Sequence, residues 1–217
     1  MSFTVYGAAG SGSVPIEAAL TLMDLPYTVV EAATWEGDEA RARVAPVNPL
    51  RQVPAIVLPS GEVMTESAAI LLWLGDSYPE SGLAPSPGDP LRARYLRWMV
   101  YLPAAIYPMY WVRDEPGRLA DGPGQEQVIL ARTRERIAEC WRAMEAQIEP
   151  GQYLLGDRLT LLDLYVAVMS RWSPRRTRFY REAPRMGEVV RRVDAEARLA
   201  RFWAERFAFD AGWEGPA

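Results

Sequence analysis

The sequence NPLRQVPAIVLPSGEVMTESAAI, residues 48–70, decides the fold. Within it, residues 54–58 and 62–64 are short runs typical of strands, and Pro59-Ser60-Gly61 between them indicates a hairpin turn. The Thr-Glu-Ser that follows begins an apolar helix over residues 68–74. This stretch therefore predicts a β-hairpin and a helix in direct succession.

Upstream of this stretch, strand-like and helix-like pieces alternate. Residues 3–6 are a short β-type run, and residues 7–12 form a loop of small residues. Pro15 suits the first turn of a helix, and apolar residues follow it at helical spacing, so a helix is expected after Ser13, a plausible N-cap. The remaining elements are a strand over 27–30 and a polar helix over 36–44, which makes the order β-α-β-α-β-β-α.

A stretch rich in proline, glycine and serine, residues 81–90, indicates a linker after this half. The charge balance changes there. Residues 1–81 carry three arginines and ten acidic residues, whereas the remainder carries 21 arginines and 18 acidic residues. We therefore expect two domains, residues 1–81 and residues 88–217.

Beyond the linker the pattern is helical throughout. Leu159-Thr160-Leu161-Leu162-Asp163 is a capping box with Asp in the role of Glu or Gln, and it opens a nearly all-apolar helix over 161–169 that should be buried. Pro103 and Pro108 should kink a long helix over 90–111. The other expected helices cover 125–148, 184–195 and 197–207.

The composition excludes several chemistries. The 217 residues are 49% hydrophobic and 24% charged, as in ordinary soluble globular proteins. There is no histidine, and all 24 basic residues are arginine, which excludes a Ser–His–Asp triad, a Cys–His pair, Schiff-base chemistry and a Walker-type phosphate loop. Because Cys140 is the single cysteine, no internal disulfide can form and no metal site is expected.

Charge and hydropathy also limit the partners. A net charge of −4 argues against nucleic acid, so the five arginines that lie among aromatic residues over 171–181 are expected to be a solvated loop or interface arginines. The N-terminus is not a signal peptide, and no stretch reaches the ~18–20 apolar residues of a membrane span. We expect a cytoplasmic protein that does not bind membranes.

Residues 48–70 resemble the glutathione-binding half of cytosolic glutathione transferases, whose pattern is roughly N-P-x-x-x-V-P-x-L, a hairpin and x-E-S-x-A-I. Residues 159–163 are similar to the capping motif in the helical domain of the same family. The resemblance covers essentially the whole chain. It implies a thioredoxin-like α/β domain followed by an all-α domain, glutathione as co-substrate, and usually a homodimer.

The resemblance implies how glutathione would bind. Val53–Pro54 would be the family's cis peptide, which costs only ~0.5–1 kcal/mol over trans, and its exposed backbone would pair with the cysteinyl part of the tripeptide. Ser67, at a helix start, would hold the γ-glutamyl carboxylate with support from Glu66. At the glycyl end we expect Gln52 and, unless it is simply solvated, Arg51.

The thiol must also be activated, because the thiolate is the nucleophile and a free thiol has a pKa near ~8.5. Lowering that pKa by ~2 units requires ~2.7 kcal/mol, which a hydroxyl hydrogen bond and a helix N-terminus can supply. Ser11, five residues past Tyr6, stands where theta-like and zeta-like branches have the catalytic serine. Ser13 is the second candidate, and Tyr6, which aligns with the catalytic tyrosine of other branches, is the third.

The second substrate is expected to be apolar, because the helix over 91–111 would wall the pocket with aromatic residues. These are Tyr101, Tyr107, Tyr110 and Trp111, any of which could instead be ordinary core. We interpret the chain as a Ser-type glutathione S-transferase that conjugates the thiolate to a hydrophobic electrophile in detoxification. The alternatives are a non-catalytic binding or scaffold protein of this fold and a glutathione-dependent isomerase or dehalogenase. Ser13-Val14-Pro15 departs from the zeta-like motif, so the subclass stays open.

Overall fold

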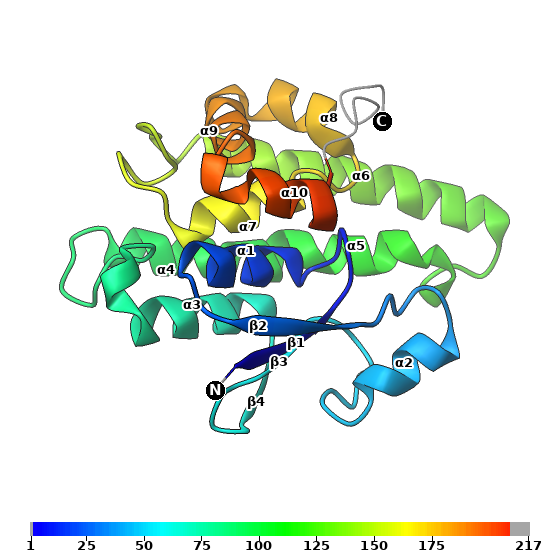
Figure 1. The fold of residues 1–217 in the computed structure, drawn as a ribbon. Coiled ribbons are helices and arrows are strands. Elements are labelled where there is room, and N and C mark those ends of the chain that lie inside the picture. Colours follow the sequence, from blue (N-terminus) through cyan, green and yellow to red (C-terminus); the bar gives the residue numbers. More distant parts are fainter. Residues whose placement is uncertain (1, 209–217) are drawn as a thin grey trace.

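The N-terminal half is a mixed sheet with helices on it (Figure 1). The computed structural model describes residues 2–208. Its first elements are β1 (Phe3–Gly7), α1 (Val14–Leu22), β2 (Tyr27–Glu31), α2 (Asp38–Val44), β3 (Ala55–Val57), β4 (Val63–Thr65) and α3 (Ser67–Ser77). The strand order is β2-β1-β3-β4, with β1 parallel to β2 and antiparallel to β3, and β3 antiparallel to β4. The predicted order of elements is confirmed.

The C-terminal half is helical, as predicted. Its helices are α4 (Arg92–Tyr101), α5 (Tyr107–Asp114), α6 (Pro123–Glu145), α7 (Leu161–Met169), α8 (Arg175–Glu182), α9 (Pro184–Asp194) and α10 (Ala200–Arg206). All nine residues of α7 are buried, because this helix packs between α1 and α9 (Figure 1). Within residues 2–208, no helix combines the length and apolar character needed to cross a membrane.

The single helix expected over 90–111 is two helices. A π-helical turn over residues 102–106 separates α4 from α5. Pro103 lies in the first turn of that segment, where its missing N–H removes a helical hydrogen bond. The predicted interruption at Pro103 is confirmed, whereas Pro108 lies in the first turn of α5 and begins a helix instead of bending one.

The arginine-rich stretch over 171–181 is not a solvated loop. Most of it forms α8, and Arg171 and Arg176 are buried, with Arg176 fully inaccessible. Both pair with the carboxylate of Asp194 on α9, through Arg171 Nη2 at 2.5 Å and Arg176 Nη1 at 2.8 Å. Arg176 Nη2 also donates to the carbonyl of Ala167 at 2.8 Å. These arginines join α7, α8 and α9, so the expectation of solvated or interface arginines is wrong for them.

The capping box at the start of α7 has the predicted geometry. Asp163 Oδ2 accepts hydrogen bonds from the N–H and the hydroxyl of Thr160 at 2.8 and 2.7 Å, and Oδ1 accepts from the N–H of Leu154 at 2.8 Å. Burial raises the pKa of Asp163 to about 6, because the loss of hydration outweighs these hydrogen bonds. The cap therefore also ties the loop before α7 to the helix.

The loop of small residues packs directly against the helical half at Gly12. A Cβ built on Gly12 would overlap the hydroxyl of Tyr107 from α5 and would lie 3.3 Å from Pro54 Cδ. The backbone of Gly12 is outside the left-handed region, so any cost of a side chain there comes from this contact alone. Gly12 thus sets the distance between the small-residue loop and the helical half.

We expect Asp163→Asn to lower the free energy of unfolding by about 1–3 kcal/mol, since an amide has one acceptor oxygen and its NH2 group would face the N–H of either Leu154 or Thr160. Urea denaturation measures this. Thr160→Ser keeps the hydroxyl and should cost much less. An equal loss in both variants would show that the side-chain cap is not the cause.

Gly12→Ala should weaken ligand binding and lower the melting temperature, because the new methyl group displaces the Tyr107 hydroxyl. Tyr107→Phe in the same chain removes the overlapping atom and should restore a large part of both losses. Thermal melts and calorimetric titration with glutathione measure them. No recovery in the double variant would contradict the assigned contact.

Candidate active site

A cavity of about 1180 Å³ opens between the two halves. The N-terminal half contributes the loop at 10–12, the turn around 48–54 and the start of α3. The helical half contributes α5, parts of α6 and the segment that contains Trp172. Most of the residues proposed from the sequence for glutathione lie together here, although they come from three separate loops.

Among the three candidate hydroxyls, Ser11 lines the cavity, whereas Ser13 and Tyr6 do not. Ser11 is 6% exposed. Its Oγ accepts hydrogen bonds from the backbone N–H groups of Ala8 and Ser13, each at 3.2 Å. Two donors occupy the two acceptor positions of a hydroxyl oxygen, which leaves its proton to be donated.

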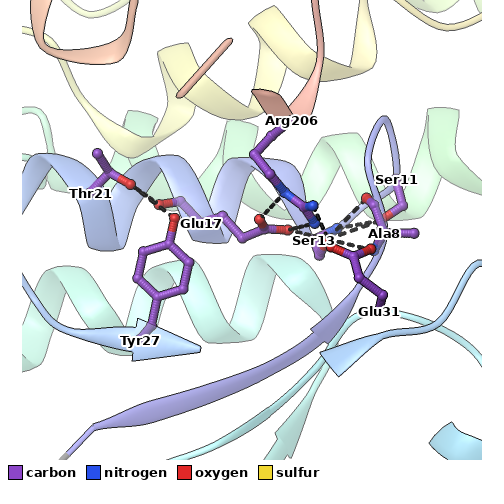
Figure 2. A network of polar contacts seen from close by, with 8 residues as sticks. All are labelled: Ala8, Ser11, Ser13, Glu17, Thr21, Tyr27, Glu31 and Arg206. Atoms are coloured by element: carbon purple, nitrogen blue, oxygen red, sulfur yellow. Dashed lines mark hydrogen bonds and ion pairs between the residues drawn. The ribbon is translucent and has the colours of Figure 1, made fainter. Parts of the chain in front are cut away.

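Ser13 faces the interior and is fully buried (Figure 2). It is the N-cap residue of α1, as predicted, and its carbonyl accepts from the N–H of Glu17 at 3.0 Å, but its side chain makes no cap hydrogen bond. Its hydroxyl donates instead to Glu17 Oε1 at 2.6 Å, and its Oγ lies 2.9 Å from that of Ser11. Because the one proton of Ser13 goes to a carboxylate, Ser11 is the donor in the contact between the two serines.

Glu17 carries a carboxylate with no solvent exposure on α1. Its partner is Arg206 on α10, whose Nε lies 2.6 Å from Oε2 (Figure 2). Arg206 also pairs with Glu31 at the end of β2. Burial alone would lower the pKa of Arg206, but hydrogen bonds to the two glutamates raise it. The sequence analysis did not identify this ion pair. The signal for it was Glu17 itself, an acidic residue among the buried apolar residues of α1.

The turn before β3 presents an unpaired strand edge. The Val53–Pro54 peptide is cis. Within residues 2–208, the N–H and C=O of Val53 make no hydrogen bond. Asn48 holds the turn: its Nδ2 donates to the carbonyl of Gln52 at 2.9 Å and its Oδ1 accepts from the N–H of Leu50 at 3.0 Å. Val53 therefore lines the cavity with a free backbone donor and acceptor.

Glu66 and Ser67 lie where β4 passes into α3. Ser67 is the first residue of α3, and its hydroxyl lies 2.7 Å from that of Tyr165 on α7. Glu66 has a φ of 66°, an uncommon value for a side-chain-bearing residue and one often found at functional sites. Both residues line the cavity next to the helix N-terminus. Tyr165, which sequence reasoning missed, stays a neutral phenol because burial raises its pKa.

Aromatic side chains form the opposite wall. Tyr107, Tyr110 and Trp111 line the cavity, whereas Tyr101 points elsewhere and donates to the carbonyl of Cys140 at 2.9 Å. Trp172 lies edge-to-face with Tyr107 at 5.3 Å and with Tyr110 at 5.1 Å between ring centroids. Burial raises the pKa of Tyr107, so its hydroxyl is a donor near neutral pH. Trp172 was not among the predicted site residues.

The lining is also more basic than the expected apolar pocket. Arg41, Arg113, Arg118 and Arg134 line it. Arg113 and Arg118 pair with Asp114 and Glu115. Arg41 makes no ion pair within the described chain, and its Nε donates to the carbonyl of Thr34 at 2.9 Å. Arg41, like Arg51, therefore has cationic charge available for an anion.

Comparison with known proteins agrees with this architecture. Residues 13–77 match the N-terminal domain model of glutathione S-transferases, and residues 127–207 match the C-terminal domain model. A glutathione transferase homologue from Sulfitobacter, solved with bound glutathione, has the same fold, with a TM-score of 0.82, 24% identity, and coverage of 94% of this chain and 98% of that one.

Curated relatives show closer similarity in sequence. Glutathione S-transferase GST-4.5 of Xanthomonas campestris is 27% identical over 78% of this chain and 81% of its own. The uncharacterised GST-like protein YncG of Escherichia coli K12 is 38% identical over 78% of this chain and 82% of its own. With both domain models and this relative matched, the chain belongs to the glutathione S-transferase family.

Proposed function

We propose that this protein binds glutathione, stabilises its thiolate with Ser11, and transfers the sulfur to a small hydrophobic electrophile. The observation that carries the proposal is the Ser11 hydroxyl in the cavity, with both acceptor positions taken by backbone N–H groups. Toward a ligand such a hydroxyl can act only as a donor, and its one proton, which points to Ser13 Oγ in the free protein, would turn to the sulfur when glutathione binds. A donor stabilises the thiolate over the thiol and so lowers its pKa.

The reaction then needs no protein base. The sulfur releases its proton to water on binding, and the sulfur lone pair attacks an electrophilic carbon to form a carbon–sulfur bond. With an aryl or alkyl halide, the halide leaves with the electron pair of the broken carbon–halogen bond. The absence of histidine from the chain is consistent with this route, because anion stabilisation replaces general base catalysis.

The tripeptide has a matching partner for each end. The free backbone groups of Val53, preceding Pro54, would pair with the cysteinyl unit as an added strand. The N-terminus of α3 at Ser67 would bind the γ-glutamyl carboxylate, with Glu66 near the α-amine. Gln52, Arg51 and Arg41 would meet the glycyl carboxylate, and the aromatic wall with Tyr107 and Trp111 would receive the electrophile.

The domain limits and cellular setting belong to the same proposal. Residues 1–81 would be the glutathione-binding domain and residues 88–217 the helical one. We propose a cytoplasmic homodimer acting in detoxification, without a metal. Exposed apolar side chains support a self-association surface: Leu50 is 71% exposed and Val100 is 54% exposed.

The alternative function is a non-catalytic scaffold of this fold. Such a protein would bind immobilised glutathione but leave a generic aryl halide unreacted.

Ser11→Ala should reduce kcat/KM with an aryl halide at pH ~6.5 by about 100-fold, the equivalent of ~2.7 kcal/mol. Glutathione affinity should change far less. The deficit should shrink above pH ~8.5, where the free thiol ionises without help.

Ser13→Ala and Tyr6→Phe are the comparisons for this experiment. Both side chains lie outside the cavity lining, so Tyr6→Phe should not reproduce the pH-dependent loss, and Ser13→Ala, which acts only through the position of Ser11, should give a much smaller loss than Ser11→Ala. Full activity of Ser11→Ala together with an inactive Ser13→Ala would assign the thiol contact to the other serine.

Arg41→Ala should raise KM for glutathione about tenfold and leave kcat nearly unchanged, because it removes a charge-assisted contact to the glycyl carboxylate. Arg43→Ala is the matched control on the same helix, since Arg43 donates to the carbonyl of Glu31. Glutathione esterified at glycine should bind wild type and Arg41→Ala alike. A persistent difference with the ester would contradict the assigned carboxylate contact.

A further inference from the structure

We propose that the helical half positions the Ser11 hydroxyl through two residues, Trp172 and Arg206, which hold the loop over 8–13 from opposite sides. Both act through other groups and are positioning residues. The inference rests on the thiol-stabilising role proposed for Ser11.

Trp172 and Arg206 hold the peptide groups on both sides of Gly10, the residue before Ser11. The indole Nε1 of Trp172 donates to the carbonyl of Gly10 at 2.8 Å. The N–H of Gly10 donates to the carbonyl of Arg206 at 2.9 Å. Gly10 has a φ of 72°, and a Cβ there would lie 3.1 Å from the ring of Phe207. The loop conformation that presents Ser11 is thus held by three residues from the helical half.

The Arg206 side chain reaches Ser11 through a second route, drawn in Figure 2. Arg206 Nε binds Glu17, Glu17 accepts the proton of Ser13 at 2.6 Å, and Ser13 Oγ lies 2.9 Å from Ser11 Oγ. With its only proton directed to Glu17, Ser13 cannot donate to Ser11. The route therefore holds the Ser11 oxygen in place and keeps Ser13 from donating to it, so that the Ser11 proton is free to turn from Ser13 to the sulfur of bound glutathione.

Trp172 also connects this loop to the wall proposed for the electrophile. Its ring packs against Tyr107 and Tyr110 at nearly perpendicular angles of 80° and 81°, and it lines the same cavity. One side chain thus touches the electrophile wall and fixes the carbonyl next to the thiol-stabilising residue. The ring contacts on that wall therefore hold the indole in the orientation that donates to Gly10.

Trp172→Phe tests the contact between Trp172 and Gly10, because it deletes the indole N–H and keeps an aromatic ring. The ultraviolet absorption of the thiolate, followed against pH in the glutathione complex, gives the pKa of the bound thiol. We expect that pKa to rise by about one unit and kcat at pH ~6.5 to fall about tenfold. The fall should disappear at high pH, which a loss of folded protein would not do.

Trp203→Phe is the matched control. Trp203 is buried on α10, and its indole donates to the carbonyl of Val193 at 3.3 Å, away from the loop. The chemical change is the same, and the thiol pKa should stay at the wild-type value. Equal shifts in the two variants would overturn the positioning role of Trp172.

Ser11→Ala/Trp172→Phe separates this inference from the function on which it rests. If Trp172 acts through Ser11, the double variant should have the thiol pKa of Ser11→Ala alone. A shift added by Trp172→Phe in the absence of Ser11 would overturn the inference. If Ser11→Ala leaves the thiol pKa unchanged, the proposed function itself fails.

The route from Arg206 through Glu17 and Ser13 is tested by a separate pair of variants, so this test does not depend on whether Trp172→Phe folds. Glu17→Gln breaks the route between Arg206 and Ser13, because the amide keeps one acceptor oxygen and turns its NH2 group toward one of these two donors, whereas Glu31→Gln neutralises the exposed partner of the same guanidinium. We expect the thiol pKa to rise in Glu17→Gln and to stay unchanged in Glu31→Gln. A wild-type pKa in Glu17→Gln would remove Arg206 from the positioning role.

Discussion

The arrangement of the site depends on one buried charge. Glu17 lies on the first helix with no access to water, and a carboxylate in such a place is costly unless a cation and hydrogen bonds replace its hydration. Arg206 of the last described helix supplies the cation, and Ser13 supplies a hydrogen bond. Satisfying Glu17 therefore brings the first and last described helices together at the loop that carries Ser11. The pair of Glu17 and Arg206 therefore both stabilises the packing of α1 against α10 and positions the serines of the site.

A second buried charge cluster supports the same loop from the other side. Arg171 and Arg176 share the carboxylate of Asp194, which fixes α8 and α9 against α7. Trp172 follows Arg171 directly, so the position of its indole depends on this cluster. In both places the helical half uses arginine, whose several donors serve more than one acceptor at once. Arg171 and Arg176 each bind a carboxylate and a backbone carbonyl, and Arg206 binds two carboxylates. The apolar interior thus contains a few buried or partly buried arginines, each paired with a carboxylate, that orient the residues at the cavity.

Local signals made much of the fold predictable. The hairpin, the start of α3 and the capping box at Thr160 are each encoded within a few residues, and they form as expected. Helix α8 could not be predicted in the same way, because its buried face includes Arg176. A sequence pattern assigns an arginine to the surface unless its partner, here Asp194, is known. The π-helical turn after α4 likewise depends on packing around Pro103 that the pattern does not contain.

The site residues likewise fall into those that short motifs predict and those that only the tertiary structure shows. Ser11, Val53 and Ser67 lie at the ends of neighbouring elements of one sheet, so short motifs are enough to bring them together. The residues of the helical half that support the site are distant in sequence. Tyr165 lies 98 residues from Ser67, and Trp172 lies 162 residues from Gly10. Arg206 lies 189 residues from Glu17. During translation, Glu17 leaves the ribosome long before Arg206 is added. Until then the carboxylate lacks this cation, so the Ser11 loop gains the support of Arg206 only after α10 has been synthesised and has folded back against α1.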